Sequence, residues 1–244
     1  MINKLVLMSN ISKYHLGEVE SVKWIVKDKT LNVSFMSITK EVIGTITHSS
    51  FNMEDCELAI FDTKKLISLL SITQGDLLLD VETRNNRPTK LHISDTSFNL
   101  TYALADPLLI GKVGTVNETE WDATLELSSD DIDNLVKAKS ALKDVNNMLI
   151  SVETDEVDNL MCLFTFGDEN GHNNKITYQI YGEIKPTTNK IPFNSDMLRN
   201  ILHANKDMES GTLYLNYNGL IKLKFTTQHT SCEYYLVRKE QNSF

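Results

Sequence analysis

Hydrophobic and polar residues alternate along much of the chain, and this period of two predicts β-strands. In the first half of the chain we expect strands at residues 24–26, 31–36, 42–48, 56–61, 77–83, 90–94 and 98–104. In the second half we expect strands at residues 121–127, 148–153, 160–166, 175–181 and 190–193, followed by a final meander that turns at Tyr217-Asn218-Gly219.

Three segments have a helical period instead. Asp62 is a suitable N-cap for a helix over residues 63–74, in which Leu66, Leu69 and Leu70 form the apolar stripe. Ser128 or Ser129 caps a helix that runs to Lys143, and a third helix covers residues 195–206. One more short helix is expected within residues 1–22, where residues 4–8 could equally form a strand.

The two halves of the chain have the same order of elements. The apolar stripe of the helix at 63–74 returns 132 positions later as Leu198, Ile201 and Leu202, and three strands follow both helices. Two unrelated helix-and-meander units would be the simpler alternative. We predict an α+β protein with two duplicated domains, residues 1–107 and 121–244, joined by a connector at 108–120 that carries glycine breakers.

Composition excludes several classes of protein. The chain has 244 residues, 41% hydrophobic and 23% charged, without an apolar run long enough to span a membrane. Three dispersed cysteines do not form a disulfide framework, so we expect them to be reduced. Neither a phosphate-binding glycine loop nor a nucleophile or metal motif is present, and we therefore predict no catalytic residue, no metal and no cofactor.

Charge placement is the most informative feature. The net charge is −9, yet the windows 63–74, 134–143 and 197–206 contain seven Lys or Arg and no Asp or Glu. Acidic residues gather at the helix starts, just outside these windows. A solvated basic face is the usual meaning of this pattern. Short polar residues fill the rest of these faces, which also suits sequence-independent contact with a polyanion.

Several stretches resemble a known family. The strand Asp55-Cys56-Glu57-Leu58-Ala59-Ile60-Phe61-Asp62 that leads into a leucine-rich helix, the triplet Ala105-Asp106-Pro107 and the short tail ending at Phe244 are similar to the sliding clamp of T-even-type bacteriophages, the DNA polymerase processivity factor. The N-terminal region departs most from the pattern, which leaves the first helix and Lys13 open.

The resemblance implies a closed homotrimeric ring of processivity-fold (DNA clamp) domains, with helices lining the hole and antiparallel sheets outside. It implies double-stranded DNA, a DNA polymerase and a clamp loader as partners, no membrane, and the cytoplasm of the infected host cell as the location. Carried onto this sequence, the DNA-facing residues would be Lys64, Lys65, Lys137, Lys139, Lys143, Arg199, His203 and Lys206.

The same resemblance implies two further surfaces. Subunits would pair edge to edge through Phe98, Leu100, Tyr102 and Leu104 of one copy and Ile176, Tyr178 and Ile180 of the next. Partner proteins would dock in an apolar pocket formed by Leu108, Leu109, Ile110 and Phe244. Alternatively, the three connector residues hold the two domains together. A non-enzymatic structural or assembly subunit of a virus and a small hydrolase are the rival interpretations of the chain.

Overall fold

The computed structural model describes residues 1–17, 19–117, 119–167 and 174–239. The chain divides into two compact units. The first comprises Met1–Ile38, Ile43–Gly114 and Gln228–Cys232, and the second comprises Thr39–Val42, Thr115–Thr227 and Glu233–Phe244. The expected connector is divided between the units after Gly114. The described residues contain no helix that is long and apolar enough to cross a membrane.

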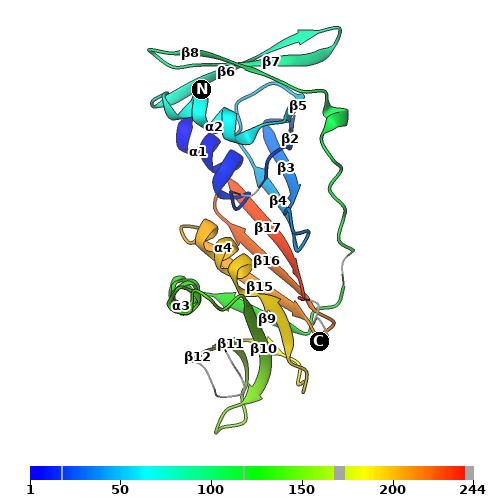
Figure 1. Ribbon diagram of the computed structural model, residues 1–244, viewed down its shortest axis with the longest axis vertical. Coiled ribbons are helices and arrows are strands. Elements are labelled where there is room, and N and C mark those ends of the chain that lie inside the picture. Colours follow the sequence, from blue (N-terminus) through cyan, green and yellow to red (C-terminus); the bar gives the residue numbers. More distant parts are fainter. Residues whose placement is uncertain (18, 118, 168–173, 240–244) are drawn as a thin grey trace. The chain divides into compact units, whose positions relative to one another are not determined.

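The first unit combines two sets of paired strands with short helices (Figure 1, mostly blue through cyan to green). Its helical segments are α1 (Lys4–Met8), the π-helical turn η1 (Ser9–Lys13), α2 (Thr63–Ser71) and the 3-10 turn η2 (Pro107–Leu109). One sheet has the strand order β1-β6-β7-β8, from Ile2–Asn3, Asp76–Arg84, Arg87–Ser94 and Asn99–Ala103. The other strands of this unit follow the order β5-β2-β3-β4, from Cys56–Ile60, Val22–Lys27, Thr30–Met36 and Val42–His48.

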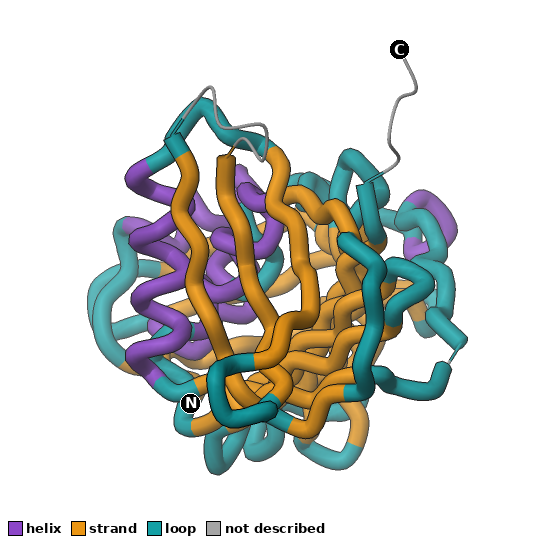
Figure 2. The backbone as a smooth tube through the Cα atoms, turned by 90° about the horizontal axis from the view of Figure 1, so that it is seen from below, coloured by secondary structure: helices purple, strands orange, loops and turns teal. Residues whose placement is uncertain are grey.

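The second unit has the same ingredients. Its helices are α3 (Ser129–Ala141) and α4 (Ser195–Asn205). One sheet has the order β12-β11-β10-β14, from Lys175–Tyr181, Leu160–Gly167, Asn147–Thr154 and Ile191–Asn194; Figure 2 shows strands of this unit with helical turns beside them. The other strands follow the order β13-β9-β15-β16-β17, from Glu183–Ile184, Ala123–Leu127, Ser210–Asn216, Leu220–Thr226 and Thr230–Val237, of which the first three residues of β17 are counted with the first unit.

The expected duplication is confirmed, and the same order of elements is also repeated within each unit. A strand, a helix and three strands follow one another twice in the first unit, as β1-α1-β2-β3-β4 and β5-α2-β6-β7-β8. The same order occurs twice in the second unit, as β9-α3-β10-β11-β12 and β14-α4-β15-β16-β17, with β13 inserted. Each unit is therefore itself a pair of similar halves.

The N-terminal segment is helical, so the alternative of a strand at residues 4–8 is wrong. Asn3 caps α1 because its side-chain oxygen accepts a hydrogen bond from the backbone N–H of Leu5 at 2.9 Å. The Asn10 amide then donates to the carbonyl of Val6 at 2.9 Å, inside the turn where α1 passes into η1. The two-residue strand β13 was not predicted, since it is too short to show a period.

The core follows the alternation of the sequence. In β2 and β3, Val22, Trp24, Val26, Leu31, Val33 and Phe35 are buried. Gly44 on the neighbouring strand β4 leaves room for the Phe35 ring, because a Cβ there would lie 2.2 Å from a ring carbon. The expected turn at Tyr217-Asn218-Gly219 joins β15 to β16, and Gly219 adopts a φ of 103°.

Candidate nucleic-acid interface and partner surface

Helix α2 presents two free cations. Asp62 starts the helix by accepting a hydrogen bond from the Lys65 N–H at 2.8 Å, while Leu66 and Leu70 turn into the core. Lys64 and Lys65 therefore lie on the solvent side, and both are exposed. No ion-pair partner for either lysine occurs among the described residues.

Helix α3 begins with a capping box. Ser128 Oγ accepts from the Asp131 N–H at 3.1 Å, and the Asp131 carboxylate accepts from the Ser128 N–H at 2.9 Å. The acidic residues thus stand at the positive end of the helix, as its dipole favours. Lys137 is exposed on the helix, and Lys143 is exposed just after the C-cap residue Leu142.

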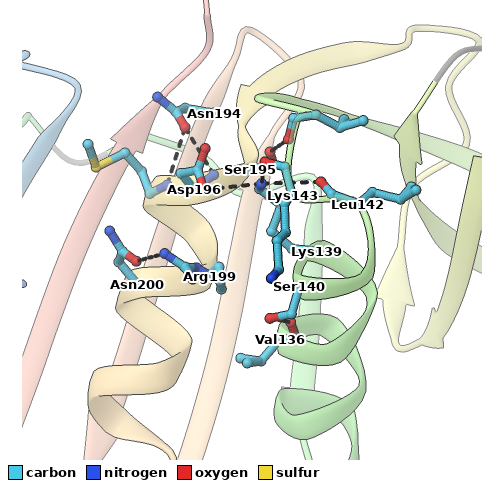
Figure 3. Close-up of polar contacts among 12 residues, drawn as sticks. Val136, Lys139, Ser140, Leu142, Lys143, Asn194, Ser195, Asp196, Arg199 and Asn200 are labelled. Atoms are coloured by element: carbon cyan, nitrogen blue, oxygen red, sulfur yellow. Dashed lines mark hydrogen bonds and ion pairs between the residues drawn. The ribbon is translucent and has the colours of Figure 1, made fainter.

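Lys139 does not face solvent, and its expected place among the DNA-facing residues is wrong. Its side chain is only 4% exposed. As Figure 3 shows, its ammonium donates to the carbonyls of Leu142 at 3.4 Å and Lys143 at 2.9 Å and pairs with Asp196 of α4 at 3.1 Å. Lys139 therefore closes the last turn of α3 and joins it to the first turn of α4.

Helix α4 completes the basic surface of the second unit. The Asn194 side chain accepts from the N–H groups of Asp196 and Met197 at 3.0 and 3.2 Å, and the predicted stripe Leu198, Ile201 and Leu202 is fully buried. Arg199 is half-buried and donates to the Asn200 side chain at 2.8 Å, as Figure 3 shows. His203 and Lys206 are exposed at the far end.

The structure thus groups the predicted cations by unit. Lys64 and Lys65 share α2 in the first unit, and the other predicted cations apart from Lys139 lie on the contacting pair α3 and α4 of the second unit or within two residues of the ends of these helices. Lys4 has a role that sequence reasoning missed: its ammonium donates to the carbonyls of Ser71, at 3.2 Å, and Thr73 at the end of α2. The partners are far apart in sequence, so no local signal could have shown this contact.

The connector residues divide into two kinds. Leu108 and Leu109 are 88% and 65% exposed on the turn η2, which Asp106 caps by accepting from the Leu108 N–H. Ile110 is only 8% exposed, so it belongs to the core and not to the expected partner pocket. Phe244 lies outside the described residues. Leu108 also borders a cavity of about 670 Å³ between η2, the start of β5 and the β6–β7 turn.

Both strands expected at subunit contacts are at sheet edges. Strand β8 ends the order β1-β6-β7-β8, and β12 ends the order β12-β11-β10-β14. These edges expose backbone groups that another strand could pair with.

The named side chains on these edges mostly face their own unit. Tyr102 is buried, and its hydroxyl bonds to the backbone N–H and carbonyl of Asp62, both at 3.0 Å. Tyr178 donates to Asp131 of α3 at 2.8 Å, and Ile180 is buried. Ile176, Leu100 and Leu104 are half-buried, while Phe98 is exposed just before β8. A contact through these edges would therefore use backbone groups and the opposite row of side chains.

Comparison with known proteins identifies the fold. No protein-family model and no curated protein sequence matches the chain. The proliferating cellular nuclear antigen (PCNA) of Entamoeba histolytica matches with a TM-score of 0.75 and 15% identity, over 98% of this chain and 96% of that chain. The PCNA of A. fulgidus, bound to the C-terminal region of FEN-1, matches with a TM-score of 0.76 and 15% identity, over 99% and 98%. The chain has the two-domain α+β fold of these PCNA-type sliding clamps.

Proposed function

We propose that the protein is a sliding clamp, which encircles duplex DNA without reading its sequence and tethers a replicative DNA polymerase. The clamp fold over nearly the full length of the chain carries this proposal. The exposed cations of α2, α3 and α4, on a chain with a net charge of −9, support it. The T-even bacteriophage type, and hence the cytoplasm of an infected host cell as its location, belong to the proposal through the resemblance of the sequence.

In this proposal three copies close a ring. Strand β8 of one copy adds to strand β12 of the next, and repeating this contact around the ring pairs both of these edge strands in every copy. Pairing also covers the exposed edges of β8 and β12, which could otherwise promote aggregation.

Helices α2, α3 and α4 would line the hole. Lys64, Lys65, Lys137, Lys143, Arg199, His203 and Lys206 would give screened contacts with phosphates, while Lys139 fixes the helices from behind. Because phosphates are equivalent at every register, such contacts hold the ring on the duplex and still let it slide. This role needs no catalytic group, metal or cofactor.

Leu108 and Leu109 are proposed to receive the polymerase and the clamp loader, together with the tail at Phe244. Large exposed aliphatic side chains on an ordered turn are typical of interaction sites. The A. fulgidus PCNA supports the idea that this fold binds segments of other proteins, since it is bound to the C-terminal region of FEN-1. Nothing in the fold favours the alternative of a viral structural or assembly subunit.

The oligomeric state tests the proposal. We expect native mass spectrometry at micromolar concentration to give a trimer of the 27.7 kDa chain. The Leu104 N–H bonds to the carbonyl of Thr89 on β7, so alternation turns the Thr101 N–H toward the free edge of β8. Thr101→Pro should therefore give folded monomers, because the backbone donor that proline removes lies at the free edge. The variant also loses the exposed hydrogen bond between the Thr101 hydroxyl and His92 Nδ1, at 3.1 Å within the same sheet.

A proline placed away from both strand edges is the control for this test. Thr188→Pro alters an exposed loop between β13 and β14 and should leave the trimer intact. Gln179→Pro on β12 should separate the copies as Thr101→Pro does. A parent protein that stays monomeric at micromolar concentration would overturn the ring.

A further inference from the structure

A cavity of about 780 Å³ lies in the second unit where α3 ends. Its wall includes Lys143 after the helix, Asn146 and Asn147 where β10 begins, and Lys239 after β17. None of the predicted sites includes this cavity as a whole.

Several hydrogen-bond donors converge on it. Lys143 is exposed and has no ion-pair partner among the described residues. The Lys239 ammonium donates to the Asn147 side chain at 2.6 Å, which holds this cation at the rim. Asp144 is the acidic residue of the described wall, which also contains the two lysines.

The end of a helix normally repels an anion, because its last carbonyls carry partial negative charge. Here the buried ammonium of Lys139 covers the carbonyls of Leu142 and Lys143, both of which line the cavity. Lys139 thereby brings a third cation behind the wall, while Asp196 balances part of its charge. Among the described residues here, the three lysines Lys139, Lys143 and Lys239 outnumber the two carboxylates Asp144 and Asp196.

We propose that this cavity binds a phosphate group of the duplex backbone, and that Lys239 is therefore a DNA-contact residue outside the helices. The lysines would supply the charge, and the amide of Asn146 a neutral hydrogen bond, a combination that positions phosphate without reading bases. This inference rests on the proposed function, because threaded DNA is the source of the phosphate.

Two titrations of the intact protein at low ionic strength test the site. In the first, inorganic phosphate is added while amide signals are followed by NMR; the signals of Asn146, Asn147 and Lys239 should shift in the parent. The shifts should be lost in Lys143→Gln/Lys239→Gln. They should persist in Lys224→Gln, which removes one exposed lysine from strand β16 of the same unit.

In the second titration, fluorescence anisotropy measures the affinity for a short duplex at several salt concentrations. Lys143→Gln and Lys239→Gln should each reduce the slope of log affinity against log salt by about one, as expected for one lost phosphate contact. Lys224→Gln should leave the slope unchanged.

Results that contradict the cavity proposal can be distinguished from results that contradict the clamp proposal. If the duplex binds and Lys137→Gln weakens it, but Lys143→Gln and Lys239→Gln do not, the cavity is not a DNA site although the clamp proposal stands. If phosphate shifts the cavity signals but the parent does not bind duplex, both the DNA assignment and the clamp proposal fail. If poly-glutamate shifts the signals of Asn146, Asn147 and Lys239 in the parent but inorganic phosphate does not, the cavity is a site for carboxylates and the phosphate assignment is overturned.

Discussion

Lys139 fixes the packing of two helices through one buried ammonium. Three oxygen atoms surround its nitrogen, from the carbonyls of Leu142 and Lys143 and from the carboxylate of Asp196. The partly exposed carboxylate can be hydrated if the lysine is lost, but the two carbonyls at the helix end would lose a donor. The residue is therefore a stability determinant on the inner side of the proposed DNA face.

Lys139→Met should lower the free energy of unfolding by about 2 kcal/mol, because methionine fills the space but leaves those oxygens unpaired. Urea denaturation followed by circular dichroism measures the change. The control Lys137→Met, two positions away and exposed, should alter stability by less than about 0.5 kcal/mol. Equal stability of the two variants would show that the buried contacts contribute nothing.

The buried histidine His15, in the first unit, leads to a prediction about how stability depends on pH. The side chain is 1% exposed and packs against the Phe35 ring, with centroids 5.1 Å apart. Burial lowers the pKa of His15 from 6.5 to about 4, which a weaker contact with the backbone of Ile11 opposes. The unfolded state therefore binds the proton more readily than the folded state.

Stability should consequently fall as the pH drops from about 6.5 to about 4, by up to about 3 kcal/mol from this group. His15→Phe removes the titrating ring and should flatten this part of the pH profile, measured as urea midpoints across the range. Burial also lowers the pKa of His48, so this residue contributes with the same sign in both proteins. Parallel profiles of parent and variant would contradict the assignment to His15.

At the scale of elements, local signals predicted most of the fold. Strands β4 and β12 have the predicted bounds, Val42–His48 and Lys175–Tyr181, because alternation and flanking turns mark them clearly. Helix α2 begins after Asp62 as its cap predicts, although it ends at Ser71 and not at residue 74. Helix ends depend on weak contacts, so their position is poorly encoded locally.

The candidate site was less predictable than the fold, since it depends on which way each side chain turns. A lysine in a polar helix segment looks like a surface residue, and only the approach of Asp196 from another helix makes Lys139 internal. Likewise, Ile110 differs from its neighbours Leu108 and Leu109 only in facing the core. Long-range contacts of this kind leave no pattern in a single sequence.

At the scale of the whole molecule, the fold resembles that of known proteins much more closely than the sequence does. Two PCNAs share 15% identity with this chain yet superpose with TM-scores of 0.75 and 0.76. A protein that holds DNA topologically needs sheet edges, helix packing and a positive lining, and many sequences satisfy these requirements. The distribution of charge is therefore a better test of the proposed function than the identity of any one residue.

Reversing charge on the helices tests this distribution. In Lys64→Glu/Lys65→Glu/Lys137→Glu, three exposed cations on α2 and α3 become anions, while the buried residues of both helices remain. We expect an unchanged fold and trimer, because none of the three lysines has an ion-pair partner among the described residues. Affinity for a short duplex at 0.1 M salt, measured by anisotropy, should fall by at least about tenfold, since attraction becomes repulsion in every copy.

The matched control places the same change of charge elsewhere. Lys27→Glu/Lys112→Glu/Lys224→Glu alters three exposed lysines on strands and the connector, so the net charge of the two triple variants is identical. If only the total charge mattered, both variants would lose duplex affinity equally, and the helices would have no special place in binding. A ring that holds DNA by its helices requires the control to bind nearly as the parent does, because repulsion from the outer surface is screened beyond about 10 Å at 0.1 M salt.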